Sequence, residues 1–142
     1  DLEANRGRLD LYLAATDGSR VRRLTSHEAA DSQPRWSADG RSLYFVSSRS
    51  GQAQVWRLSL EGGEAQPVTR LPLDVDALEV APGGRHLVLS MAVFPGKSPG
   101  ETKAALEAKE KSKAFVRPAA KKTRANMAAT LARIEEIVTA PG

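Results

Sequence analysis

The sequence predicts an all-β fold with a helical C-terminal tail. Three observations support this class: residues 1–95 repeat themselves, Asp-Gly or Gly-Gly turns recur along them, and the strand pattern ends after Phe94. When segment 36–41, Trp-Ser-Ala-Asp-Gly-Arg, is moved forward by 44 positions, it lies on Val-Ala-Pro-Gly-Gly-Arg of segment 80–85. The same shift places Leu43 and Phe45 on Leu87 and Leu89, so turn and strand positions repeat together.

This period identifies the kind of repeat. A four-stranded propeller blade has about 40–45 residues, whereas helical hairpin repeats of the common type have ~34. We therefore expect about two four-stranded antiparallel blades of an incomplete β-propeller in residues 1–95, the first without its inner strands. Because stacked repeats do not bury their faces singly, and usually about three or more are needed, we expect this chain to be a piece of a longer propeller.

Four turn signals divide residues 1–95 into short apolar segments. Asp-Gly and Gly-Gly suit two-residue hairpin loops because they accept positive φ, and they occur at 17–18, 39–40, 62–63 and 83–84. The segments between these turns predict eight strands. Their ranges are Leu9–Ala15, Val21–Thr25, Pro34–Ser37, Ser42–Ser47, Gln54–Leu60, Gln66–Thr69, Ala77–Ala81 and His86–Ala92.

Two features of these strands make further predictions. Residues 43–46, Leu-Tyr-Phe-Val, are apolar at both parities, which indicates a strand covered on both faces by neighbouring blades. Leu9, Leu11 and Leu13 have the opposite parity to Trp56, Leu58 and Leu60 under the 44-residue shift. This mismatch predicts a bulge or a displaced strand in one copy. A generic antiparallel meander with Asp-Gly turns is the alternative to the repeat.

The strand-turn-strand segment 34–51, Pro-Arg-Trp-Ser-Ala-Asp-Gly-Arg-Ser-Leu-Tyr-Phe-Val-Ser-Ser-Arg-Ser-Gly, resembles the repeat of TolB-like propellers. The continuation through Gln54–Leu58, Gly62-Gly63-Glu64 and Val68-Thr69 resembles the propeller domain of the prolyl oligopeptidase family of serine peptidases, in its dipeptidyl-peptidase and acylaminoacyl-peptidase branch. This resemblance extends from about Asn5 to Ala114. Ala38 occupies a position where that family usually has Pro.

In that family the propeller does not cleave peptides. The resemblance implies that these blades cap an α/β-hydrolase domain of the same parent protein and restrict access to short peptide substrates, with the catalytic residues elsewhere in the parent. It also implies a periplasmic or secreted location, although this chain carries no signal segment. The alternative function is a TolB-like scaffold for protein–protein interaction.

Charge and composition exclude several other classes. Residues 1–95 carry a net charge of −1, whereas residues 96–142 carry +5. A basic segment can neutralise phosphates, but only Phe115 could stack on a base, so we expect no nucleic-acid partner. The absence of cysteine excludes disulfides and thiolate metal ligands. No apolar run approaches the ~20 residues of a membrane span.

The remaining residues form two segments. Residues 96–114 predict a helical insertion or linker, with a helix over Thr102–Lys113 that Thr102 caps and a Glu107–Lys111 pair supports. Residues 115–142 predict a basic segment with a C-terminal amphipathic helix over 124–139. Its apolar stripe predicts a helix packed on the sheet or fraying from the end, and a partner-binding helix is the alternative. The stripe consists of Met127, Leu131, Ile134 and Val138, widened by Ile137.

One motif resembles a catalytic site. Residues 96–100, Gly-Lys-Ser-Pro-Gly, match the G-x-S-x-G nucleophile elbow between a predicted strand and a predicted helix. The residue after the nucleophile must donate its N–H to the oxyanion, and Pro99 has none. Both His27 and His86 precede Ser98, contrary to the hydrolase order of serine, acid and histidine. We interpret Ser98 as a linker serine.

No metal or cofactor site is predicted. His27 and His86 are far apart in sequence and lack a partner at ligand spacing, and Asp74 and Asp76 do not continue into the ligand pattern of a Ca²⁺ loop. We interpret the two aspartates as a solvated turn. The aromatic residues Trp36, Tyr44, Phe45 and Trp56 are interpreted as blade core and not as a ligand cage. The sequence thus assigns this chain no catalytic, cofactor-binding or metal-binding residue.

Overall fold

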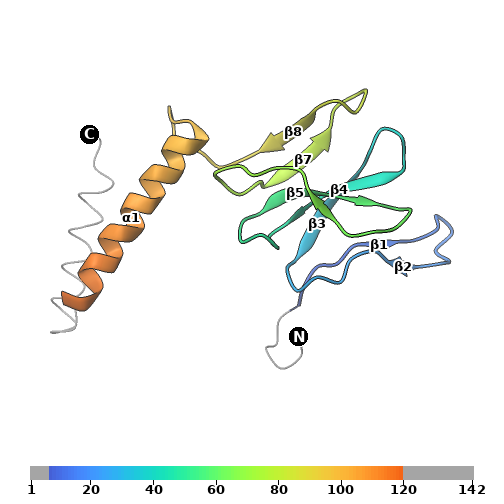
Figure 1. Cartoon of the computed structure of the whole chain (residues 1–142), viewed down its shortest axis with the longest axis horizontal. Helices are drawn as coiled ribbons and strands as arrows, with labels where there is room; N and C mark the ends of the chain where they lie inside the picture. Colours follow the sequence, from blue (N-terminus) through green and yellow to red (C-terminus); the bar gives the residue numbers. More distant parts are fainter. Residues whose placement is uncertain (1–6, 120–142) are drawn as a thin grey trace. The chain divides into compact units, whose positions relative to one another are not determined.

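A computed structural model describes residues 7–119, in which eight strands form three antiparallel sheets and one helix follows them (Figure 1). Within the described residues, those up to Ala92 and those from Val93 onward form two compact units. The sheets are β1–β2, β3–β4–β5–β6 and β7–β8. The strand bounds are β1 Tyr12–Leu13, β2 Arg22–Arg23, β3 Asp31–Trp36, β4 Ser42–Ser47, β5 Gln54–Ser59, β6 Gln66–Pro67, β7 Ala77–Val80 and β8 Leu87–Ser90.

All eight predicted strands are present, and they divide over three blades. The central sheet is one complete four-stranded blade, while β1–β2 are the last two strands of the preceding blade and β7–β8 are the first two of the following one. Together they amount to two blades of an incomplete propeller, as the sequence predicts. Strand β7 lies beside β3, its counterpart in the central sheet, so the central sheet and the following sheet approach each other through their first strands (Figure 1).

The 44-residue period holds at the level of individual hydrogen bonds. Backbone amides and carbonyls at equivalent positions pair in the same way in both copies, with nearly equal distances. The N–H of Leu24 donates to the C=O of Leu11 as the N–H of Val68 donates to the C=O of Val55, both at 2.8 Å. In the same way Asp31 donates to Leu9 and Val75 to Ala53, both at 2.7 Å. Ser37 donates to Ser42 and Ala81 to His86, both at 2.9 Å. A threonine hydroxyl repeats too: Thr25 Oγ1 accepts from the Leu11 amide and Thr69 Oγ1 from the Val55 amide, both at 2.9 Å.

The bulge predicted in the strand around Leu9–Leu13 or in the strand around Trp56–Leu60 is wrong in its location. Tyr12 pairs with Arg23 as Trp56 pairs with Pro67, which is the same register 44 residues later. The parity mismatch arises because the apolar side chains occupy alternate positions in the two copies, whereas the backbone pairing is the same in both. The irregularity lies in β3, where the pairing with β4 shifts between Ser32 and Arg35. Gln33 absorbs it with a φ of 56°, the local backbone distortion that a bulge requires.

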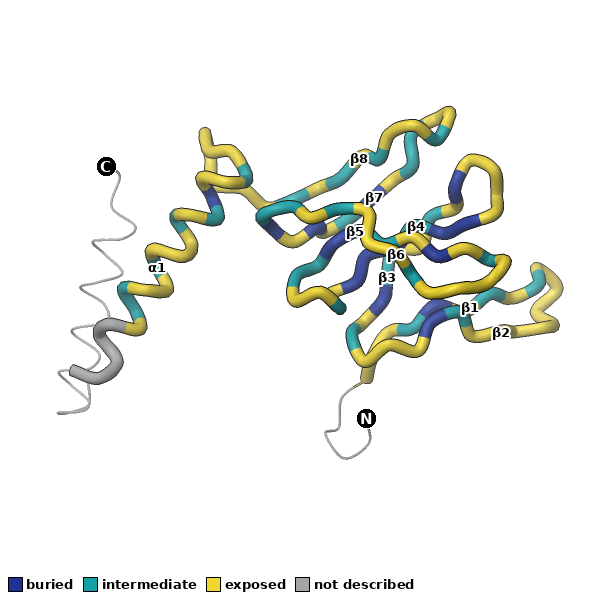
Figure 2. The backbone as a smooth tube through the Cα atoms, viewed as in Figure 1, coloured by how far each residue is buried: buried dark blue, intermediate teal, exposed yellow. Residues whose placement is uncertain are grey.

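Strand β4 is buried along most of its length (Figure 2), and both of its faces are covered, as predicted. Phe45 is fully buried against Leu11 and Leu58, and Val46, on the other face, packs with Val75 and Leu78. Each cluster contains residues of the central sheet and of one neighbouring sheet. Burial between sheets is therefore the main apolar stabilisation of this unit, at roughly 25 cal/mol per Å² of buried apolar surface.

Helix α1 comprises Pro99–Ala119 and begins earlier than the sequence predicts. The predicted cap, Thr102, is wrong: its side chain is buried, and its Oγ1 accepts a hydrogen bond from the Phe94 amide at 3.0 Å. Ser98 caps the helix instead, because its Oγ accepts from the Glu101 amide (3.2 Å) while a Glu101 carboxylate oxygen accepts from the Ser98 amide (2.7 Å). This reciprocal pair is a capping box, with Pro99 at the first helical position.

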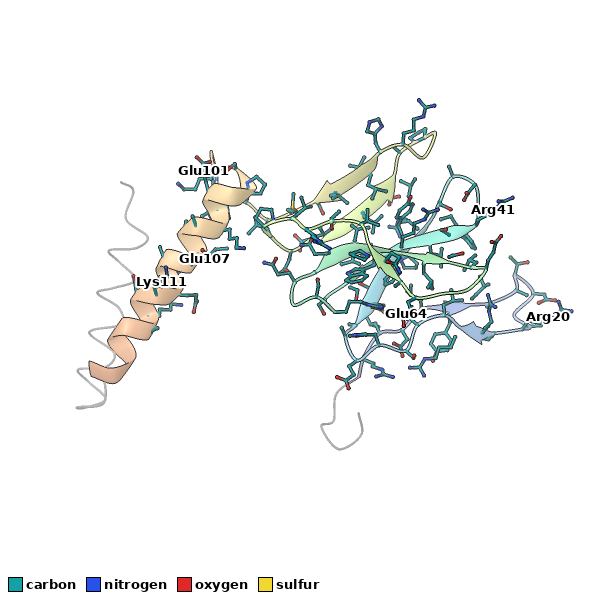
Figure 3. All side chains as sticks on the ribbon, viewed as in Figure 1. Arg20, Arg41, Glu64, Glu101, Glu107 and Lys111 are labelled. Atoms are coloured by element: carbon teal, nitrogen blue, oxygen red, sulfur yellow. The ribbon has the colours of Figure 1, made fainter. Side chains whose placement is uncertain are left out.

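On the surface of α1, Lys103 and Glu107 approach each other at 3.9 Å (Glu107 is labelled in Figure 3). The second predicted helix, over 124–139, lies outside the described residues. No helix within residues 7–119 combines the length and the apolar character that crossing a membrane would need.

Candidate functional site

A cavity of about 500 Å³ lies between the β1–β2 sheet and the central sheet. One wall is the segment that follows β2, and the other is formed by β5, by the β5–β6 turn and by the loop after β4. Glu64 lies in the β5–β6 turn (Figure 3). The lining residues are Leu24, Thr25, Ser26, His27, Arg49, Trp56, Leu58, Gly63, Glu64 and Ala65.

A buried ion pair fixes the cationic side of this cavity. Arg49 Nη2 lies 2.8 Å from Asp31 Oδ2, and the Asp31 side chain is fully buried. The Arg49 Nε–H donates to Ser47 Oγ at 3.0 Å. The pair joins the start of β3 to the loop after β4, and a buried charge of this kind is tolerated only because its partner is in place.

Aromatic rings hold the same guanidinium from another side. The Arg49 Cζ lies 5.4 Å from the centroid of Phe45 and 5.2 Å from that of Trp56, within the range of cation–π attraction. Since Phe45 and Trp56 are directly paired across β4 and β5, both rings lie on the same face of the sheet. The cavity therefore has a wall that is both aromatic and cationic.

Polar groups that could contact a ligand complete the cavity. The buried indole Nε1–H of Trp56 has no hydrogen-bond partner within residues 7–119. The Nδ1 of His27 accepts from the Ala29 amide at 3.0 Å, which orients the ring. With the Glu64 carboxylate, the lining carries one cation, Arg49, and one anion. Such groups suit noncovalent binding of polar groups such as those of a peptide.

Ser98 of the G-x-S-x-G motif and the two histidines considered as its partners lie in different parts of the structure. Ser98 belongs to the second unit, where its hydroxyl caps α1. His27 lines the cavity, and His86 directly precedes β8, where its carbonyl accepts from the Ala81 amide at 2.9 Å. His27 and His86 thus lie beside different sheets, and the observed role of Ser98 is structural.

The two aspartates singled out by the sequence lie in the connection between β6 and β7. Asp74 Oδ1 accepts from the Ala53 amide at 2.8 Å, and the Asp76 amide donates to the Ser90 carbonyl at 2.8 Å. Asp74 therefore ties the connection to the start of β5. Over residues 7–119, no group of three or more His, Asp or Glu side chains is placed to hold a metal ion.

The interpretation of the aromatic residues as blade core is correct for three of the four. Phe45 is buried, and Tyr44 and Trp56 pack against the two clusters. The interpretation is wrong for Trp36, whose side chain is 51% exposed. It pairs with Leu43 and so lies on the face that meets the preceding blade, of which the described residues supply only the last two strands. These strands cover Phe45 on β4 but leave Trp36 on β3 open.

The sequence analysis did not single out Arg49 and Asp31. They are 18 residues apart and belong to no motif. A signal existed: Asp31 lies three residues before the predicted strand Pro34–Ser37, and Arg49 lies two residues after its antiparallel partner Ser42–Ser47. These two positions lie at the same end of the sheet, where opposite charges could pair.

Comparisons with known proteins agree with this architecture. The model of the family described as "TolB beta propeller domain" matches residues 2–113. The chain belongs to the TolB beta propeller domain family. The uncharacterized peptidase YuxL of Bacillus subtilis is 39% identical over 89 residues, 62% of this chain and 13% of that protein. Dipeptidyl-peptidase 5 of Porphyromonas endodontalis is 26% identical over 102 residues, 72% of this chain and 14% of that protein.

A solved structure gives the same fold. The putative TolB from Agrobacterium tumefaciens matches with a TM-score of 0.53 and 34% sequence identity, covering 56% of this chain and 29% of that one. The chain thus spans less than a third of each of these proteins. The family explains the 44-residue period and the three-sheet arrangement, and both TolB proteins and peptidases contain relatives of these blades.

Proposed function

We propose that this chain is a non-catalytic propeller segment of a serine peptidase resembling the prolyl oligopeptidase family. The blades cap an α/β-hydrolase domain of the same parent protein and limit which peptides reach it. The observation that carries this proposal is the 39% identity to a peptidase over 89 residues. The match to dipeptidyl-peptidase 5, which covers more of the chain, supports the dipeptidyl-peptidase branch.

The capping role of Ser98 supports a chain that is inert by itself. A nucleophilic serine needs a base within hydrogen-bond reach and an amide donor after it. Ser98 Oγ instead accepts from the Glu101 amide, and the next residue is Pro99. In this proposal the peptide substrates contact the blades without being cleaved there, and the parent is periplasmic or secreted.

A scaffold is the second candidate function. The solved TolB structure, 34% identical over its match, favours blades that recruit a protein partner and have no attached hydrolase domain. Sequence downstream of Gly142 in the encoding frame separates the two. A nucleophile elbow without proline, followed by Asp and then His, supports the peptidase, and an end within the propeller supports the scaffold.

Labelling of the 142-residue chain with a serine-reactive fluorophosphonate probe tests whether it is inert. We expect no stoichiometric label in the chain or in the matched Ser98→Ala variant, while an active serine peptidase in the same reaction is labelled fully. Stoichiometric labelling that is lost in Ser98→Ala would overturn the non-catalytic assignment.

A further inference from the structure

The cavity between the β1–β2 sheet and the central sheet has the size of a ligand site. Its volume of about 500 Å³ lies within the range of about 300–1,000 Å³ that ligand pockets have. Its lining residues all lie between Leu24 and Ala65, and the exposed Tyr12, Trp36 and Val88 are not among them. Both walls of the cavity therefore belong to sheets that the structure describes.

The charges in the lining are not balanced. Arg49 already has its partner, because its Nη2 lies 2.8 Å from Asp31 Oδ2, and its side chain is only 13% exposed. The Glu64 carboxylate is exposed and makes no ion pair with any residue in the described range 7–119. The uncompensated charge of the cavity is thus negative, which favours a cationic ligand over an anionic one.

The repeat shows that the fold does not require this carboxylate. Arg20 occupies the equivalent turn position 44 residues earlier, so the turn accepts a charge of either sign (both residues are labelled in Figure 3). The same holds for His27, whose counterpart Leu71 packs against the cluster around Val46. The blade architecture thus accounts for neither polar side chain, whereas contact with a ligand accounts for both.

Apolar surface lies beside these polar groups. Three partly buried residues pack against the cluster around Phe45 and also line the cavity. They are Leu24, Trp56 and Ala65. A long alkyl chain that ends in a cation can bury its methylene groups on such a surface while its charged end stays at an exposed carboxylate. Lysine and arginine side chains combine these two properties.

We infer that this cavity binds the basic side chain of a peptide, with the alkyl stem against the apolar wall and the cationic end at Glu64. His27 supplies a second contact. Its Nδ1 accepts a hydrogen bond from the Ala29 amide at 3.0 Å, so the neutral ring carries its proton on Nε2 and can donate to a peptide carbonyl. This binding rests on the proposed function only in that the ligand is a peptide, and it means that the blades favour peptides that carry lysine or arginine.

Titration with capped tripeptides tests this recognition. Acetyl-alanyl-lysyl-alanine amide is compared with the norleucine peptide, which lacks only the ammonium group. The Trp36→Phe chain is used, because Trp56 in the cavity is then its only tryptophan and its fluorescence reports binding. We expect the lysine peptide to bind about two- to fivefold more tightly, the factor typical of an ion pair open to water. Equal affinities, or no response of Trp56 to the lysine peptide up to tens of millimolar, would overturn the inference.

Three variants separate the charged contact from the neutral one. Glu64→Gln should remove the preference for lysine. Glu61→Gln, on the same β5–β6 turn but outside the cavity lining, is the matched control and should retain the preference. His27→Leu, which matches the residue type of the repeat counterpart, should weaken the binding of both peptides equally and leave the ratio of their affinities unchanged. A preference that survives in Glu64→Gln, or that is lost in either of the other two variants, would overturn the role of Glu64.

These binding measurements need no hydrolase domain. The fluorophosphonate labelling and the sequence downstream of Gly142 test the proposed function separately. Failure of the cavity to discriminate between the two peptides therefore overturns the basic side chain as its ligand, and a peptidase assignment that fails is recognised by the other two results.

Discussion

Two glycines at equivalent positions of successive blades should respond differently to the same substitution. Gly40 and Gly84 both have positive φ, 71° and 73°, so alanine at either costs about 1–2 kcal/mol in backbone strain. A Cβ at Gly40 would meet nothing within 4 Å, but a Cβ at Gly84 would lie 2.5 Å from the Cβ of Ala38. We therefore expect Gly84→Ala to cost a further 1–3 kcal/mol or so, the typical cost of overpacking.

Urea unfolding followed by tryptophan fluorescence measures both free energies of unfolding. The Ala38→Gly background removes the obstructing methyl group, so Gly84→Ala should there cost no more than Gly40→Ala in the unaltered chain. This double-mutant cycle isolates the contact between turns of neighbouring blades from the φ strain. Equal costs of Gly40→Ala and Gly84→Ala, or no relief from Ala38→Gly, would refute the close approach of the two turns.

Further predictions concern the core, the ion pair and the helix cap. Phe45→Ala should lower the free energy of unfolding by about 3–5 kcal/mol, measured by urea unfolding, because the ring is fully buried between two sheets. Asp31→Asn should cost about 3–5 kcal/mol by leaving the Arg49 charge without its partner, and the double variant with Arg49→Met should cost less than the single one. Ser98→Ala should cost helix α1 about 1 kcal/mol, seen as reduced ellipticity at 222 nm. The hydrogen bond from the Ser98 amide lowers the pKa of Glu101, so the carboxylate stabilises the cap above the ordinary pKa of Glu, and this contribution is lost as the pH falls through the lowered value. Helical ellipticity should therefore fall on acidification in the unaltered chain and less in Glu101→Gln.

The strands could be predicted because the information that specifies them is local. Alternating apolar residues and Asp-Gly or Gly-Gly turns lie within a few residues of the hairpins that they form, and the 44-residue period adds an independent check. The apolar run at 43–46 correctly predicted a strand covered on both faces. The position of the bulge could not be read in this way. The apolar positions in residues 9–13 differ in parity from those 44 residues later, although the backbone register is the same. The distortion at Gln33 does not alter the pattern of apolar residues, so the sequence does not indicate it.

The candidate site was harder to predict because its contacts are not local. Asp31 and Arg49 meet only after β3 and β4 pair, and Trp56 reaches the same guanidinium from a third strand. Ser98 shows the opposite difficulty, since one local pattern fits two roles. A serine followed by proline and, three residues on, by glutamate is a helix cap as well as part of a G-x-S-x-G motif. The missing N–H of Pro99 decides between these roles, because proline cannot supply the oxyanion donor but fits the first turn of a helix.

The exposure of Trp36 shows that the sheet packing is incomplete within the described residues. A propeller sheet is stable when both faces are covered, yet the described residues cover both faces only at β4 and β5. The chemistry of the remaining faces is that of blade interiors, with Tyr12, Trp36 and Val88 at positions whose counterparts carry apolar side chains. Exposure of these apolar faces to water is unfavourable. A surface that covers them is therefore stabilised by the same kind of apolar burial that holds the central blade to its neighbours. Further blades of a propeller supply such a surface, and substitutions on the exposed faces test this requirement without disturbing the central blade.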